Sequence, residues 1–144
     1  MCSSDLGGTA NYVCTLGGRY FTVQNNGAAP LVLIQSVNDG ATWNPQFNAT
    51  NAVQTDRAQV NAYRHANIMR DLALSVSPSY PTVSTQASSF IINNNIASTC
   101  NAYYSANTIN FYAAGGGCAN TSFGTVVHHE YGHNLVEKIG RAHV

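Results

Sequence analysis

The chain has 144 residues, of which 44% are hydrophobic, so it is long enough and apolar enough to bury the core of one globular domain. Charged residues make up only 8% and the formal net charge is zero, which argues against nucleic acid or an acidic membrane surface as a partner. No apolar run approaches the roughly 20 residues that cross a bilayer, and the excess of Asn, Ser, Thr, Gln and Gly is common in secreted enzymes, so we expect an extracellular protein with no membrane partner.

Both ends of the chain look foreign to the rest. The tail KIGRAHV resembles the translation of a common sequencing adapter, and the head MCSSDL fits the reverse complement with GTG as the start codon. Two such matches in opposite sense predict that residues 1–6 and 138–144 are non-native and that the natural segment is a gene fragment. The alternative is that both ends are natural termini.

The first part of the chain is predicted to be rich in β-structure. RYFTVQN and LVLIQSV are β-branched and aromatic runs, and NNGAAP between them has turn chemistry. The polar stretch NDGATWNPQFNATN then predicts a loop, which we expect Trp43 and Phe47 to fix against a core.

The stretch NAVQTDRAQVNAYRHANIMRDLAL predicts a helix of about twenty residues. Its small and apolar residues recur at spacings of three and four and so share one face, namely Ala58, Ala62, Ala66, Met69 and Ala73. Thr50 or Asn51 could cap its start, and SPSYP ends it. We interpret His65, near this stripe, as a packed or hydrogen-bonded histidine rather than a ligand.

SFIINNNI predicts a strand, and CNAYYSANTINFYAAGGGC predicts a hairpin whose arms AYY and TINFY flank SAN. Cys100 and Cys118 bracket this hairpin, so we favour a disulfide between them over two free thiols, which leaves Cys14 free or paired elsewhere. A last helix begins at Asn120 or Thr121. This order of elements predicts an α+β fold with a mainly antiparallel sheet.

The last helix contains the pattern HExxH, formed by His129, Glu130 and His133. The spacing of four puts both imidazoles on one face, where each can reach one Zn²⁺ at about 2.0–2.1 Å. Glu130 is rotated by about 100° from them and can take a proton from a zinc-bound water as it attacks a carbonyl. We therefore predict two zinc ligands and a catalytic base; the alternative is a pair of solvated histidines beside a surface glutamate. His128 points elsewhere.

Two ligands do not complete a catalytic zinc site, which normally takes three from the protein. In the extended pattern HExxHxxGxxH the third histidine would follow His133 by six residues, but Val136 and Ile139 occupy the glycine and histidine positions. The class of zinc peptidases that carries HExxHxxGxxH is therefore disfavoured. No other nearby His, Asp or Glu makes a convincing third ligand.

The segment CNAYYSANTINFYAAGGGCANTSFGTVVHHEYGH resembles the thermolysin and fungalysin group of gluzincin metallopeptidases. The likeness is tight over residues 101–112 and 125–134 and loose over residues 52–137. It implies a zinc endopeptidase acting on peptide or protein, with residues 51–137 as the N-terminal half of the catalytic domain. Residues 7–50 would then be a β-rich extension or the end of a pro-region.

The resemblance also implies roles for single residues. Asn101, Ala102 and Tyr103 would form an edge strand that pairs with the backbone of an extended substrate; the alternative is an ordinary hydrophobic hairpin arm. In that group the third zinc ligand is a glutamate some twenty or more residues past the second histidine, and the transition-state stabiliser comes later still. The chain contains neither, so we expect the fragment by itself to be inactive or nearly so.

Two further hypotheses compete with this one. A non-catalytic secreted surface module with a decayed peptidase site would lack the downstream glutamate altogether. A different zinc hydrolase could share HExxH, although the strand NAYY favours an extended peptide as substrate.

Overall fold

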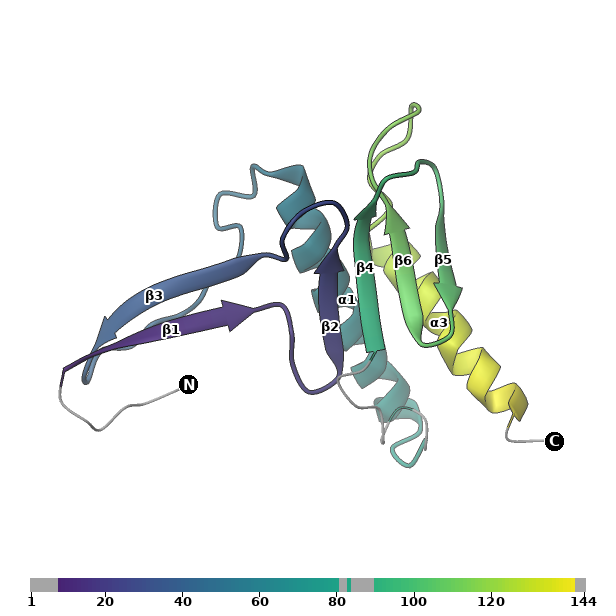
Figure 1. The fold of residues 1–144 in the computed structure, drawn as a ribbon. Coiled ribbons are helices and arrows are strands. Elements are labelled where there is room, and N and C mark those ends of the chain that lie inside the picture. The colour runs from purple at the N-terminus through teal and green to yellow at the C-terminus, as the bar shows by residue number, and fades with distance from the viewer. Residues whose placement is uncertain (1–7, 81–82, 84–89, 142–144) are drawn as a thin grey trace.

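A computed structural model describes residues 8–80, 83 and 90–141 of the chain. The described residues form an α+β fold, which confirms the predicted class (Figure 1). Its elements in chain order are β1 (Thr9–Thr15), β2 (Phe21–Asn25), β3 (Val32–Asn38), α1 (Gln54–Val76), β4 (Phe90–Ile96), β5 (Ala102–Ser105), β6 (Thr108–Tyr112) and α3 (Gly124–Arg141). Neither α1 nor α3 is long and apolar enough to cross a membrane.

The larger sheet has four strands in the order β2-β4-β6-β5 (Figure 1). β5 and β6 pair antiparallel, but β2 pairs with β4 and β4 with β6 in parallel. This sheet is therefore mixed, where the sequence predicted a mainly antiparallel one. The reason is the path of the chain: it passes from β4 to the edge as β5 and turns back into the gap as β6, which leaves β6 parallel to β4.

The smaller sheet is a two-stranded antiparallel ribbon of β1 and β3. It projects from the main sheet on the side of β2, and neither of its strands contacts another described helix or strand (Figure 1). Val13 and Ile34 pair across it and are 64% and 72% exposed. On the loop that follows, Trp43 contacts Tyr12 with ring centroids 6.4 Å apart, so the predicted anchoring by Trp43 is to the ribbon.

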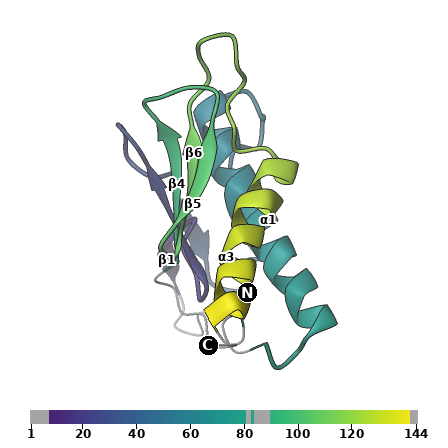
Figure 2. The same cartoon turned by 90° about the vertical axis from the view of Figure 1, so that its right-hand side faces the viewer.

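Both helices cover the same face of the main sheet (Figure 2). α1 packs on β2 and β4, α3 packs on β5 and β6, and the helices also contact each other. The core between the layers includes an aromatic cluster in which the ring of Tyr131, from α3, lies 5.5 Å from Phe21 and 5.4 Å from Phe90. Burial of these large rings stabilises the docking of α3 on the sheet.

The long helix α1 confirms the prediction from the alanine spacing, since Ala58, Ala62 and Ala66 are buried. Small side chains on this face let the helix approach the sheet and α3 closely. The helix begins after Val53, which makes no side-chain capping bond, a few residues later than expected.

The predicted hairpin is confirmed as β5 and β6. Ala106 and Asn107, between the strands, have positive φ of 42° and 65°, the combination that a two-residue turn matching the strand twist requires. A disulfide joins Cys100 and Cys118, with their Cα atoms 5.2 Å apart, and Cys14 is a free thiol. The bridge ties the start of β5 to the loop that follows β6.

Candidate metal centre

The loop before α3 is fixed by asparagine side chains, and this sets where the helix begins. Asn120 Oδ1 accepts from the Ser122 amide at 3.0 Å, and Asn120 Nδ2 donates to Asn95 at 2.8 Å. The Ser122 hydroxyl donates to the buried Asn94 Oδ1 at 2.7 Å. Because these groups bond to β4 and to the loop itself, the helix begins at Gly124 rather than at Asn120 or Thr121 as predicted.

Within α3 the sequence directs neighbouring side chains to different surroundings. Val127 and Tyr131 are fully buried against the sheet, whereas His129 and His133 are exposed. Glu130 is only 6% exposed. A helix turns by about 100° per residue, so residues that are neighbours in sequence face different directions. One side of α3 can therefore be buried while the two histidines next to it in sequence face solvent.

The imidazoles of His129 and His133 converge on one point. Their Nε2 atoms lie 3.0 Å apart and their ring centroids 4.6 Å apart. Two nitrogens that each lie about 2.0–2.1 Å from one tetrahedral ion are roughly 3.3 Å apart. The pair therefore fits a single Zn²⁺ with little adjustment of either side chain.

Glu130 stands where two clefts meet. One cleft, of about 510 Å³, is lined by Cys100, Asn101, Ala102, Cys118, Ala119, Thr121, Phe123, Val126, His129 and Glu130. The other, of about 520 Å³, is lined by Tyr104, Glu130, His133, Val136 and Glu137. Each cleft is lined by one histidine of the pair, and Glu130 lines both, so we treat the two clefts together as one groove along α3.

The other wall of this groove comes from β5, which is an edge strand of the main sheet. Asn101 and Ala102 line the first cleft, and their role in pairing with a substrate stays a prediction. Tyr103 is not among the lining residues; it is 40% exposed and its ring lies 6.0 Å from that of Tyr112. Alternation along a strand explains the difference, because Ala102 and Tyr104 share the face toward α3 and Tyr103 points to the opposite face.

A contact that joins the two walls of the groove was not predicted from the sequence. Tyr104 lines the second cleft, and its hydroxyl donates to Asn134 Oδ1 of α3 at 3.3 Å. Asn134 is only 1% exposed and directly follows His133. This bond joins the edge strand β5 to α3. Strand alternation could have found Tyr104, but nothing local in the sequence identifies its partner.

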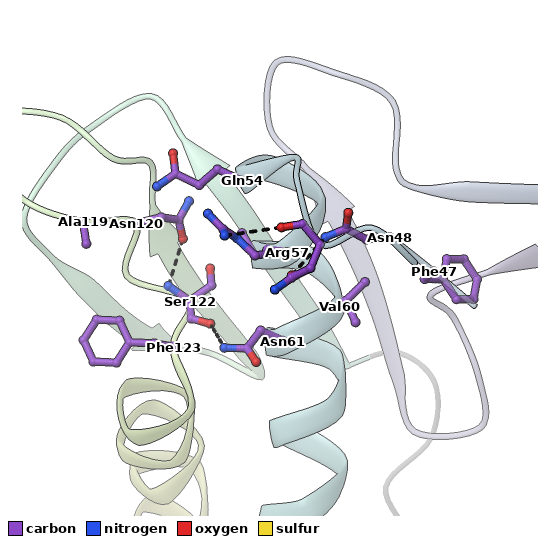
Figure 3. A pocket seen from close by; sticks show the side chains of 12 residues that line it. Phe47, Asn48, Gln54, Arg57, Val60, Asn61, Ala119, Asn120, Ser122 and Phe123 are labelled. Carbon is purple, nitrogen blue, oxygen red and sulfur yellow. Dashed lines mark hydrogen bonds between the residues drawn. The ribbon is translucent and has the colours of Figure 1, made fainter. Parts of the chain in front are cut away.

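A third, polar cleft of about 380 Å³ adjoins the groove, and Phe123 and Ala119 line both (Figure 3). Its polar side chains mostly bond to one another or to nearby backbone: Arg57 Nη1 donates to the Asn51 carbonyl at 3.4 Å, and Asn61 donates to the Ser122 carbonyl at 2.9 Å. None of its lining residues carries a carboxylate, thiol or imidazole. We interpret this cleft as support for the loop that leads into α3.

The centre has two candidate ligands in the part of the chain that the structure describes. Within residues 8–80, 83 and 90–141, no group of three His, Cys, Asp or Glu side chains is placed to hold a metal ion. The gluzincin-like third ligand expected from the sequence therefore stays a prediction. In comparison with known proteins, the chain matches no family model, no curated protein and no solved structure.

Proposed function

We propose that the chain carries the metal-binding and proton-transferring half of a zinc peptidase site. The observation that supports this function is the convergence of His129 Nε2 and His133 Nε2 to 3.0 Å beside Glu130, which lines both halves of the groove. Paired imidazoles suit Zn²⁺, and an adjacent carboxylate is a suitable general base. An extended peptide is the favoured substrate, since the groove runs along an edge strand that can recruit another strand.

Each residue has a distinct part in this proposal. His129 and His133 would hold the ion through Nε2, and zinc, when bound, would supply a Lewis acid that makes a water more acidic. Glu130 takes the proton of the attacking water and returns it to the leaving amine. The backbone of Asn101 and Ala102 orients the peptide along the groove.

The proposed site needs a third protein ligand. We assign this ligand to a segment outside the described residues, where the gluzincin resemblance implies a glutamate. The chain alone should then bind zinc weakly and hydrolyse little or no peptide. An extracellular location is part of the same proposal, because a disulfide and a low content of charged residues suit an oxidising compartment.

The first prediction concerns zinc binding by the chain itself. Calorimetric titration should show that His129→Ala and His133→Ala each weaken Zn²⁺ binding, whereas Glu130→Gln leaves it within a few-fold of the original. Asp56→Asn is the matched control, since Asp56 lies in the first turn of α1 and lines neither cleft. Binding that survives loss of both histidines would show that the ion sits elsewhere.

The second prediction concerns catalysis and needs the longer reading frame, so the source DNA should be resequenced across both ends. If the frame continues past residue 137 into a helix bearing a glutamate, the longer protein should hydrolyse a quenched fluorescent peptide. Glu130→Gln in that protein should lower kcat by about 100- to 10,000-fold while zinc content is unchanged. Full activity of this variant would rule out Glu130 as the base.

The non-catalytic module remains the second candidate, and the two-ligand set among the described residues is the observation that favours it. The same longer protein distinguishes the non-catalytic module from the peptidase. Zinc bound through His129 and His133 without any peptide hydrolysis would support this module and exclude the peptidase.

A further inference from the structure

A second pair of histidines lies between the two helices, away from the groove. His65 of α1 and His128 of α3 are 63 residues apart in sequence, yet His65 Nδ1 lies 3.1 Å from His128 Nε2. Their ring centroids are 5.0 Å apart and the rings are tilted by 58°. The contact spans two helices, so it cannot be predicted from the spacing of either histidine within its own helix.

The close approach of these rings depends on Gly124, at the first turn of α3. A Cβ atom at this position would lie 2.6 Å from Cε1 and 2.8 Å from Nδ1 of His65. Any larger residue would therefore push the His65 ring away from His128. The glycine leaves the ring seated at the helix–helix contact.

Arg64 contacts the other ring nitrogen of His65. Its Nη1 lies 3.5 Å from His65 Nε2, which is the nitrogen remote from His128. A guanidinium only donates hydrogen bonds, so this contact favours the tautomer of His65 with its proton on Nδ1. An ion bound at Nδ1 therefore displaces that proton and competes with the Arg64 contact.

We propose that His65 Nδ1 and His128 Nε2 form a second site for a divalent transition-metal ion, one that clamps α1 to α3. Two imidazole nitrogens at this separation can share one Cu²⁺, Ni²⁺ or Zn²⁺, with water in the remaining positions. The site is separate from the His129–His133 pair, because one helical residue rotates the side chain by about 100° and His128 contacts α1 while His129 lines the groove.

The clamp has a thermodynamic consequence that does not depend on any peptidase activity. His65 and His128 come together only when α1 and α3 are docked, so the ion binds the folded chain in preference to the unfolded one. By mass action the ion then stabilises the fold by RT ln(1 + M/Kd), where M is the free ion concentration.

The experiment uses a background in which these two are the only histidines. The chain has five histidines, so His129→Ala, His133→Ala and His143→Ala together leave His65 and His128. Calorimetric titration of this protein with NiCl₂ should show one site, and Ni²⁺ at 100 times its Kd should raise the folded-to-unfolded ratio in urea by about 100-fold.

Two variants of this background test the ligands. His65→Gln and His128→Gln should each weaken Ni²⁺ binding by about tenfold or more and remove most of the gain in stability. Arg64→Gln should tighten binding, because it removes a cation next to the site. All variants keep the same thiols and termini, so binding at those groups cancels in the comparison.

A direct spectroscopic measurement covers the case in which a glutamine variant fails to fold. In the two-histidine background, paramagnetic Cu²⁺ at a low molar ratio should selectively broaden the imidazole resonances of both histidines. Equal Ni²⁺ affinity in all variants, or broadening of only one imidazole, would overturn the proposal and leave an ordinary histidine–histidine hydrogen bond.

Discussion

Four consecutive side chains of α3 have four different surroundings. His128 contacts His65 of the other helix, His129 lines the groove, Glu130 lies between its two clefts, and Tyr131 is buried in the aromatic cluster. The helical rotation of about 100° per residue produces this separation. A short stretch of α3 therefore combines packing residues with the candidate metal ligands, and the buried Tyr131 holds the helix on the sheet.

A third prediction concerns Tyr80, whose hydroxyl donates to the Leu135 carbonyl of α3 at 2.7 Å. Tyr80→Phe removes this bond between the chain after α1 and α3. We expect the free energy of unfolding in urea to fall by about 0.5–1.5 kcal/mol. Tyr103→Phe, at a side chain 40% exposed on the other side of the sheet, is the control and should change it by less than about 0.5 kcal/mol.

The same variant should also alter the response to alkaline pH. Burial raises the pKa of Tyr80 above its usual value of 10.0, so the unfolded chain ionises first as the pH rises past about 10. The unfolded state then binds fewer protons, and the stability of the fold falls with rising pH. Tyr80→Phe should show a smaller fall, although not none, because burial raises the pKa of Tyr131 as well.

Contacts within one helix could be predicted from the sequence, and contacts between distant elements could not. The convergence of His129 and His133 follows from helical spacing within five residues. The bond of Tyr104 to Asn134 spans 30 residues and that of His65 to His128 spans 63. Such pairs depend on how whole elements dock, which no local pattern encodes.

At the scale of elements, the start of α3 depends on asparagines of β4. Asn94 and Asn95 bond to Ser122 and Asn120, the residues that lead into the helix. Asn94 is fully buried, and its Nδ2 makes no hydrogen bond. Two of the three consecutive asparagines of β4 thus help to position the start of α3 through side-chain amides. The sequence predicted this strand but gave no reason for its three asparagines.

A fourth prediction tests this support. Ser122→Ala leaves the buried Asn94 amide without its partner and should lower the free energy of unfolding by about 1–3 kcal/mol. Adding Asn94→Leu to it should restore part of the loss, because both partners are then apolar. Ser75→Ala is the control, since the Ser75 hydroxyl is exposed and bonds only within α1. Equal losses at Ser122 and Ser75 would contradict this role of Asn94.

A fifth prediction concerns the disulfide. Cys100 and Cys118 are 18 residues apart, and a bridge that closes a loop of this size stabilises a fold by roughly 3 kcal/mol. Replacing both cysteines by serine should lower the urea midpoint correspondingly, and reductant should have the same effect on the original chain. Cys14→Ser, at the free thiol, should leave the midpoint nearly unchanged.

At the scale of the whole molecule, the described chain consists of a two-layer body and a ribbon that lies outside it (Figure 1). The α+β class and most elements follow from local patterns of period 2 and 3.6. The mixed sheet does not, because strand partners are decided by the path of the chain over long distances. The separate ribbon was equally invisible, since β1, β2 and β3 look alike in sequence yet only β2 joins the body.

A sixth measurement separates these two parts. A two-stranded sheet is marginally stable without other packing, so amide hydrogens of β1 and β3 should exchange much faster than those of β4, the inner strand beneath α1. Hydrogen exchange followed by NMR resolves the strands individually. Equal protection of β1 and β4 would show that something else holds the ribbon in place.

The ribbon also stabilises the main sheet without contacting it, because it restrains the chain on either side of β2. β1 ends at Thr15 and β3 begins at Val32, and these two residues pair with each other. The segment between these two residues contains β2, which is an edge strand of the main sheet. Pairing of β1 with β3 therefore closes a short loop that includes β2. Fraying of the ribbon lengthens that tether and raises the conformational entropy that β2 must lose on joining β4. By keeping the chain segments on either side of β2 short, the ribbon thus lowers the entropy cost of adding β2 to the main sheet.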